Sequence, residues 1–167
     1  DFFGQDEIQW KARAQELIDG KFKVCFNQGI NIRLITNSDI ANTLSKLKYY
    51  DDQFESRRLY TAWDNLKDEE IFFRGVNLLE EAGVSPKHLM VYMLIGYREG
   101  ETMDEIMYRF NKMVERGIRP YPMVYNNNNK KLREFQRWVI RRYYEIFPFS
   151  EYGNMISKVD EKQISMS

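Results

Sequence analysis

Four segments of the chain share one order: a short apolar run, a polar cluster, and then a helical pattern. The apolar runs begin near Val24, Leu59, Leu89 and Tyr121. Their separation of about 30 to 35 residues is the size of a strand followed by a crossover helix. This spacing predicts an α/β fold with parallel strands. In barrels built from such units the chemistry lies at the C-terminal ends of the strands, so the polar clusters are the first candidates for a site.

The segments between the strands carry helical spacing of apolar residues, with recognisable caps. Thr36 with Asp39, and Thr102 with Glu105, predict capping boxes. Gly83 is expected to end a helix in a left-handed conformation. Helices are predicted over residues 6–17, 36–47, 68–82, 102–116 and 130–147. The last of these is a long C-terminal helix, and residues 153–167 are expected to be a mobile tail.

Composition narrows the class of protein. With 167 residues, 43% of them hydrophobic, the chain can bury a core as one domain or a large piece of one. It has 25 basic and 25 acidic residues, so the total charge gives no reason to expect nucleic acid or anionic lipid. No apolar run approaches the roughly 20 residues that span a bilayer. The acidic N-terminus does not resemble a signal peptide, and a cytoplasmic location without a membrane partner is expected.

The chain is poor in metal ligands. Cys25 is its only cysteine and His88 its only histidine, and zinc or iron-sulfur sites need several such ligands. We therefore expect no metal site in this chain, which is either non-metallic or incomplete. Cys25 is expected to be a buried small hydrophobe, and His88 is given no catalytic role. The lack of an initiator methionine suggests that a segment precedes Asp1.

Polar residues follow the first two predicted strands. Asn27, Gln28 and Arg33 could hold a carboxylate or a ribose, since amides donate and accept while arginine binds carboxylate through a paired fork. The alternative is a turn whose amides satisfy backbone groups. Asp64 and Asn65 suit a ribose hydroxyl or an amine, and the alternative for them is helix capping.

The later strand ends offer weaker signals. Residues 96–102 contain no dinucleotide glycine fingerprint and no phosphate-loop lysine. Gly96 would let a flat ligand approach the backbone, although a simple tight turn explains it equally well. Met123 could contact an aromatic ring, although methionine is more often a core residue.

The last predicted helix carries a basic stretch interleaved with aromatic residues. Its cations are Lys130, Lys131, Arg133, Arg137, Arg141 and Arg142. Such a helix could contact nucleic-acid phosphates. The favoured interpretation is a solvated face packed on its aromatic side, because the whole chain is neutral, and no nucleic-acid partner is indicated.

Taken in order, these motifs resemble the radical S-adenosylmethionine (SAM) enzymes. The resemblance rests first on Asn27-Gln28-Gly29-Ile30-Asn31-Ile32-Arg33 and covers nearly the whole chain to about Tyr152. Four further landmarks occur in the same order: residues 62–65, residues 90–102, residues 117–123 and the Arg137-Trp138 pair. The fifth-strand pattern of the family is only partly kept, because Tyr92 stands where a glycine is usual.

The resemblance implies a partial TIM-like (β/α) barrel, of which residues 1–152 would supply strands three to six. It implies that Asn27, Gln28, Arg33, Asp64 and Asn65 face the ribose and methionine ends of SAM. Gly96 and Met123 would lie near the adenine. The cofactors of the full-length parent would be SAM and a 4Fe-4S cluster. The chemistry would be reductive cleavage of SAM to start radical chemistry on an unknown substrate.

The three-cysteine loop that binds the cluster in this family is absent here. The isolated chain is therefore expected to be inactive, with the missing N-terminal segment of the same protein as its partner. Two other hypotheses stay open. One is a small-molecule lyase or hydrolase that uses Asp64 with Glu99 or Glu101 as acid and base. The other is a non-catalytic nucleic-acid module that uses the basic helix. No residue is assigned as catalytic.

Overall fold

The computed structural model describes residues 1–166, with residues 161 and 163–166 described by their backbone alone. The chain forms two compact units. The first unit comprises Asp1–Met93 and Thr102–Pro120, and the second comprises Leu94–Glu101 and the chain from Tyr121 onward. Each unit is described by itself.

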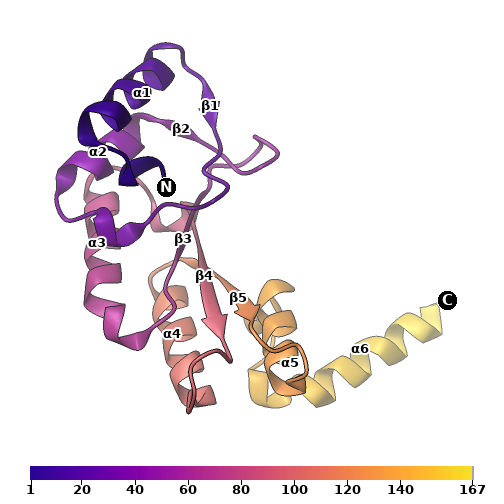
Figure 1. The fold of residues 1–167 in the computed structure, drawn as a ribbon. Helices are drawn as coiled ribbons and strands as arrows, with labels where there is room; N and C mark the ends of the chain where they lie inside the picture. Colours follow the sequence, from indigo (N-terminus) through magenta and orange to yellow (C-terminus); the bar gives the residue numbers. More distant parts are fainter. Residues whose placement is uncertain (167) are drawn as a thin grey trace. The chain divides into compact units, whose positions relative to one another are not determined.

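The first unit contains most of the strands (Figure 1). Its helices and strands are α1 (Glu7–Asp19), β1 (Lys23–Val24), α2 (Ser38–Lys46), β2 (Lys48–Tyr49), β3 (Leu59–Ala62), α3 (Glu69–Glu81) and α4 (Met103–Glu115). Strands β4 (Leu89–Ile95) and β5 (Arg119–Val124) begin in this unit and end in the second. Short 3-10 turns link them: η1 (Phe2–Gly4), η2 (Ile32–Leu34), η3 (Leu66–Asp68) and η4 (Pro86–His88).

The strands form two small sheets. Strand β1 pairs in parallel with β2, and β3 pairs in parallel with β4 from Leu59 opposite Leu89 to Ala62 opposite Tyr92. The order in the second sheet is β3-β4-β5. The prediction of an α/β fold with parallel strands is therefore confirmed. Both sheets are open in the part of the chain that is described, and no barrel closes there. Strand β2 was not predicted, because two residues are too few to show an alternation of apolar and polar side chains.

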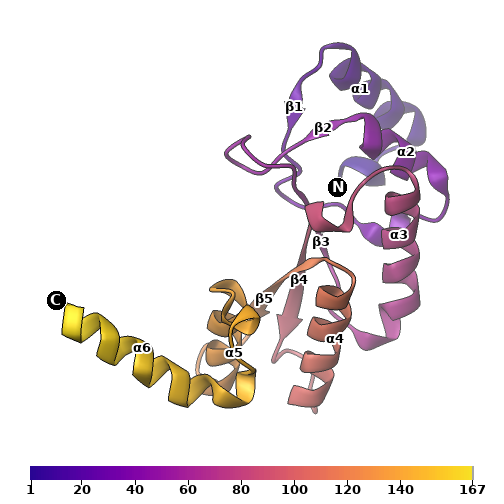
Figure 2. The same cartoon turned by 180° about the vertical axis from the view of Figure 1, so that it is seen from behind.

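The core of the first unit lies where helices cover the β3-β4 sheet (Figure 2). Leu89, Val91 and Met93 of β4 are fully buried, and the residues between them are half-buried. The alternation shows that one face of this strand is buried more completely than the other. Helix α3 contributes Phe72, whose ring stacks on Trp63 with centroids 5.1 Å apart. Such aromatic stacking contributes beyond burial alone.

Of the three helix ends with a predicted cap, the structure confirms two. Thr102 Oγ1 accepts from the Glu105 amide at 3.2 Å and Glu105 Oε2 accepts from the Thr102 amide at 3.1 Å, which confirms that capping box. Gly83 ends α3 with φ of 104°, as predicted. The box at Thr36 is wrong, because Asn37 is the cap and its side chain accepts from the Asp39 amide. Asparagine is the stronger cap of the two.

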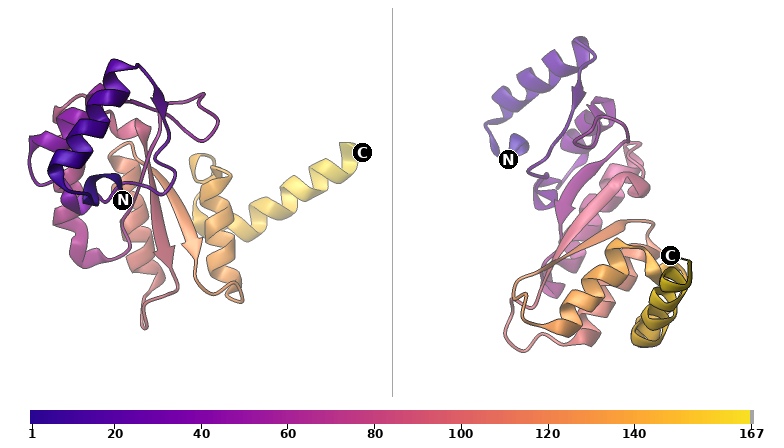
Figure 3. Two further views of the ribbon diagram at one scale, coloured as in Figure 1. Left: turned by 45° about the horizontal axis from the view of Figure 1, so that its top comes forward. Right: turned by 90° about the vertical axis from the view of Figure 1, so that its right-hand side faces the viewer.

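In the second unit the predicted long helix is shorter than expected. Helix α5 (Lys130–Ile140) stops before Arg142, which has φ of 58°. Two 3-10 turns follow, η5 (Tyr143–Glu145) and η6 (Phe149–Glu151), and then α6 (Tyr152–Met166) (Figure 3). The chain turns because Trp138 Nε1 donates to the Phe147 carbonyl at 3.0 Å. The predicted tail, residues 153–167, is helical through residue 166. Its mobility stays a prediction. Residue 167 lies outside the described residues.

A partly buried polar contact links β2 to the turn before β4 within the first unit. The hydroxyl of Tyr49 in β2, a residue only 1% exposed, lies 2.7 Å from Nδ1 of His88, the last residue of η4. The guanidinium carbon of Arg57 lies 3.8 Å from the Tyr49 ring centroid, and Arg57 Nε donates to the Tyr49 carbonyl. Burial first, then the charges of Arg57 and Arg58, lower the pKa of His88 below 6.5. The neutral ring is therefore favoured, and in the tautomer protonated at Nε2 its Nδ1 can accept from the Tyr49 hydroxyl.

This contact predicts a pH dependence of stability. The folded state disfavours protonated His88, so the unfolded chain binds more protons below the ordinary pKa of 6.5. The free energy of unfolding should fall as the pH drops from about 7.5 to about 5.5. Urea titrations across this range measure it. The variant His88→Asn keeps an acceptor near Nδ1 without the titration and should lose most of the slope. An equal slope in this variant would contradict the assignment.

Candidate functional site

The segment that follows β1 is held against β3. The amide of Gly29 donates to the Phe26 carbonyl at 2.8 Å and closes a turn over Asn27 and Gln28. Gly29 has φ of 80°, and a Cβ there would lie 3.1 Å from the Tyr60 carbonyl oxygen. A glycine is required here both for its conformation and for the close approach of β3.

Ile30 forms two hydrogen bonds that attach the loop after β1 to β3. The Ile30 amide donates to the Tyr60 carbonyl at 2.7 Å, and Thr61 Oγ1 donates to the Ile30 carbonyl at 2.8 Å. The second bond is buried. The loop therefore runs along β3, although it is not itself a strand.

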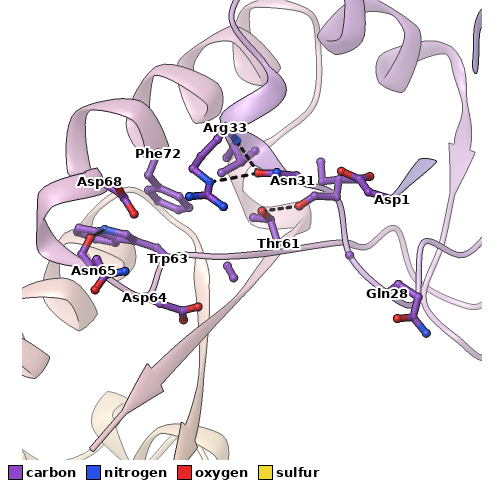
Figure 4. Close-up of a pocket in the computed structure, with 14 residues that line it drawn as sticks. Asp1, Gln28, Asn31, Arg33, Thr61, Trp63, Asp64, Asn65, Asp68 and Phe72 are labelled. Carbon is purple, nitrogen blue, oxygen red and sulfur yellow. Dashed lines mark hydrogen bonds between the residues drawn. The ribbon is translucent and has the colours of Figure 1, made fainter. Parts of the chain in front are cut away.

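Turn η2 then presents Arg33. Asn31 Oδ1 accepts from the Arg33 amide at 3.1 Å, which caps the turn. Ile32 is 2% exposed and packs on Gly75 of α3, where a Cβ would meet Ile32 Cγ1 at 2.4 Å. The Arg33 guanidinium extends beside Phe72, as Figure 4 shows.

The end of β3 supplies the opposite wall. Trp63 is 1% exposed, and its Nε1 donates to the Asn65 carbonyl at 2.7 Å. Its own carbonyl accepts from Arg109 Nη1 at 2.9 Å, and this guanidinium is also buried. The backbone on both sides of Asp64 is thus fixed. The Asp64 side chain itself is exposed.

These two walls enclose a pocket of about 440 Å³. The polar and aromatic side chains that line it are Asp1, Gln28, Asn31, Arg33, Thr61, Trp63, Asp64, Asn65, Asp68 and Phe72. Three carboxylates and one guanidinium are among them. Figure 4 shows Gln28 on the far side from Asp64 and Asn65. The pocket therefore offers acidic, basic and amide side chains to a ligand.

The structure brings together four of the predicted site residues and leaves three apart. Gln28, Arg33, Asp64 and Asn65 line the pocket, whereas Asn27 is exposed on the turn beside it and does not. Gly96 and Met123 belong to the second unit.

Gly96 has a local structural explanation. It has φ of 79°, its amide donates to Glu101 Oε1 at 3.0 Å, and a Cβ would lie 2.6 Å from Leu132 Cδ1. The close neighbour of this glycine is thus a leucine of the same unit. Met123 is 44% exposed on β5, so it is not the core residue of the alternative interpretation.

Helix capping does not account for the side chains of Asn65, a predicted site residue, and of Asp68, a further pocket residue. Asn65 precedes η3 and Asp68 precedes α3, yet neither side chain makes a cap hydrogen bond. Asp68 was not predicted as a site residue, because an acid at a helix start is usually a cap. Phe72 and Thr61 were also missed, since an apolar helix position and a strand threonine carry no site signal.

The side chains that could bind a metal ion do not cluster in the part of the chain that is described. Cys25 is half-buried, which corrects its expected full burial, and it does not line the pocket. Burial first, then the charges of Asp52 and Asp51, raise the pKa of its thiol. Within the part of the chain that is described, no three residues of His, Cys, Asp or Glu are grouped as a metal site. Nor does any helix there have the length and apolarity to cross a membrane.

The fold and the pocket describe an α/β protein with a polar site between the loop after β1 and the end of β3. No model of a known protein family, no curated protein and no solved structure matches the chain. The function is therefore argued from the pocket.

The contact between Gly75 and Ile32 predicts how the pocket wall responds to a methyl group. Gly75→Ala should lower the free energy of unfolding by about 1–3 kcal/mol, as overpacking does, because a Cβ would lie 2.4 Å from Ile32 Cγ1 and 3.0 Å from the Ile32 carbonyl oxygen. Alanine normally stabilises a helix by about 1 kcal/mol over glycine. A loss of stability in Gly75→Ala would therefore indicate the steric contact with Ile32. Urea denaturation measures it. The control Gly153→Ala, with nothing within 4 Å of its Cβ, should not destabilise.

Proposed function

We propose that the pocket binds SAM and that the chain is the SAM-binding, C-terminal part of the barrel of a radical SAM enzyme. One observation carries the proposal. Gln28 and Arg33 come from one segment, Asp64 and Asn65 come from another, and all four line the same pocket. These are the residues that the resemblance implies for the methionine and ribose ends of SAM.

The charges of the pocket suit such a ligand. SAM carries a carboxylate, an ammonium and a sulfonium, so its net charge is positive. Arg33 offers a paired fork to the carboxylate. Asp64 and Asp68 offer acceptors to the ammonium or to ribose hydroxyls. A pocket with more carboxylates than guanidiniums also favours the sulfonium over the neutral thioether of S-adenosylhomocysteine.

The size and shape of the pocket support the same proposal. A volume of about 440 Å³ lies within the range of roughly 300–1,000 Å³ typical of small-molecule sites. The stacked Trp63 and Phe72 rings form a rigid wall, because both are 1% exposed and pack on Phe73. A rigid wall lowers the entropy cost of binding.

The residues present do not fit a 4Fe-4S cluster. Such a cluster needs several cysteine thiolates, and this chain has one cysteine, which does not line the pocket. The proposal therefore requires that a polypeptide segment outside these 167 residues supplies the cysteines.

The residues of this chain would bind and orient the ligand. Arg33, held by Asn31 and by the packing of Ile32, fixes the carboxylate end. Asp64 is fixed through the backbone of Trp63 and Asn65, and Trp63 and Phe72 keep water from the wall behind them. A cluster held by cysteines outside these residues would supply the reducing electron for SAM chemistry, and this chain would supply only the binding and orientation of SAM. No observation in the described residues favours the alternative acid-base reaction of Asp64 with Glu99 or Glu101.

A binding titration of this 167-residue chain tests the proposal. Isothermal titration with SAM should give saturable binding, and Arg33→Ala should weaken it by about tenfold or more, because a charge-assisted paired contact is lost. The matched control is Arg74→Ala, which removes an exposed arginine of α3 that does not line the pocket. S-adenosylhomocysteine should bind more weakly than SAM. Equal binding of SAM by the Arg33 and Arg74 variants would contradict the proposed site.

The radical chemistry needs its own test in the full-length parent protein. Anaerobic reconstitution of that protein with iron and sulfide should give broad iron-sulfur absorption and reductant-dependent cleavage of SAM. A colourless parent that binds SAM would leave the pocket standing but overturn the radical SAM assignment.

A further inference from the structure

Two tyrosines project into solvent where β4 and β5 end in the second unit. Tyr97 and Tyr125 are each 64% exposed, and their rings meet edge to face with centroids 4.9 Å apart. The Tyr125 amide donates to the Ile95 carbonyl at 3.0 Å, which holds the two strand ends together. Aromatic rings this exposed leave ring faces open to a flat partner.

The first turn of α5 lies at the same corner. Gly96, next to Tyr97, packs against Leu132, and residues 126–129 connect Tyr125 to the helix (Figure 3). Three exposed cations project from this turn: Lys130, Lys131 and Arg133. Lys130 is 82% exposed, and its ammonium reaches Glu134 only at 3.9 Å. We call Tyr97, Tyr125 and these cations the tyrosine corner.

The charge of these cations is unfavourable for the helix dipole. The first turn of α5 contains no acidic residue, and positive charge at this end of a helix opposes its dipole. By contrast, the first turns of α3 and α4 carry two acidic residues each. Local sequence choices that oppose the local fold are typical of functional surfaces.

We propose that the tyrosine corner binds single-stranded nucleic acid. An unpaired base can stack on an open tyrosine face, while Lys130, Lys131 and Arg133 contact the phosphates on either side. Asn127 and Asn128 are exposed, and their side-chain amides can meet base edges. A duplex fits less well, since its bases are already stacked.

The surface is small and the expected affinity is modest. Because the chain has zero net charge, the attraction must come from this local group of cations and not from the field of the whole molecule. Three phosphate contacts on a single strand predict a slope of about −2 for log K against log salt. The inference does not rest on SAM binding, and either proposal can fail alone.

Fluorescence anisotropy with a labelled oligouridylate and a labelled oligothymidylate of about 15 nucleotides tests the surface. The 167-residue chain should bind at low salt, and the double variant Tyr97→Ala/Tyr125→Ala should bind about tenfold or more weakly, as the loss of base stacking implies. Tyr108→Ala is the matched control, since it removes another exposed tyrosine, on α4 of the first unit. Circular dichroism should show that all variants are folded.

A charge variant provides the second measurement. Lys130→Gln/Lys131→Gln/Arg133→Gln should remove most of the salt dependence, whereas Arg137→Gln/Arg141→Gln, later on the same helix, should retain most of it. Failure of the wild-type chain to bind either oligonucleotide would overturn the inference. The inference would also be overturned if the control variants lost as much oligonucleotide affinity as the tyrosine and charge variants of the corner. Loss of SAM binding in the tyrosine variant without oligonucleotide binding would assign the corner to the cofactor instead.

Discussion

The position of the pocket depends on two hydrogen bonds that fasten Ile30 to strand β3. Its amide binds the Tyr60 carbonyl, and its carbonyl accepts from the buried Thr61 hydroxyl. Leaving either partner buried without its bond would cost about 1–3 kcal/mol. The loop after β1 can reach β3 this closely only because Gly29 has no side chain. Without this attachment Arg33 would not face the end of β3, since β1 and β3 belong to different sheets.

Regular segments were predictable because each contains its own signal. The apolar run of β4 and the helical stripes of α3 and α4 follow from periodicity, and the Thr102 box follows from local hydrogen bonding. Strand β2 has no such signal. The end of α5 also has none, since Arg142 adopts a left-handed conformation because of packing between Trp138 and the chain around Phe147. Long-range contacts of this kind override local preference.

The site was partly predictable for a similar reason. Polar clusters at strand ends are typical of sites in α/β proteins, so Arg33 and Asp64 could be named as candidates from the sequence. The bonds of Ile30 to β3, which bring the two clusters to one pocket across separate sheets, have no sequence signal. Asp68 and Phe72 could not be predicted as site residues. Asp68 stands just before α3, where an acid is usually a cap, and Phe72 has the helical spacing of a core residue. In the structure the side chain of Asp68 makes no cap hydrogen bond. Phe72 is a core residue that stacks on Trp63, and it also lines the pocket.

The total charge of the chain says nothing about how its charged groups are distributed over the fold. Equal numbers of acids and bases suggested no charged partner, yet carboxylates outnumber guanidiniums in the pocket and cations gather on the first turn of α5. Screening limits electrostatic interactions between exposed groups to about 8–10 Å at physiological salt. A ligand therefore responds to the charges that surround it and not to their sum. A neutral chain can hold a cationic ligand in one unit and an anionic one in the other, because each unit sets its own local potential.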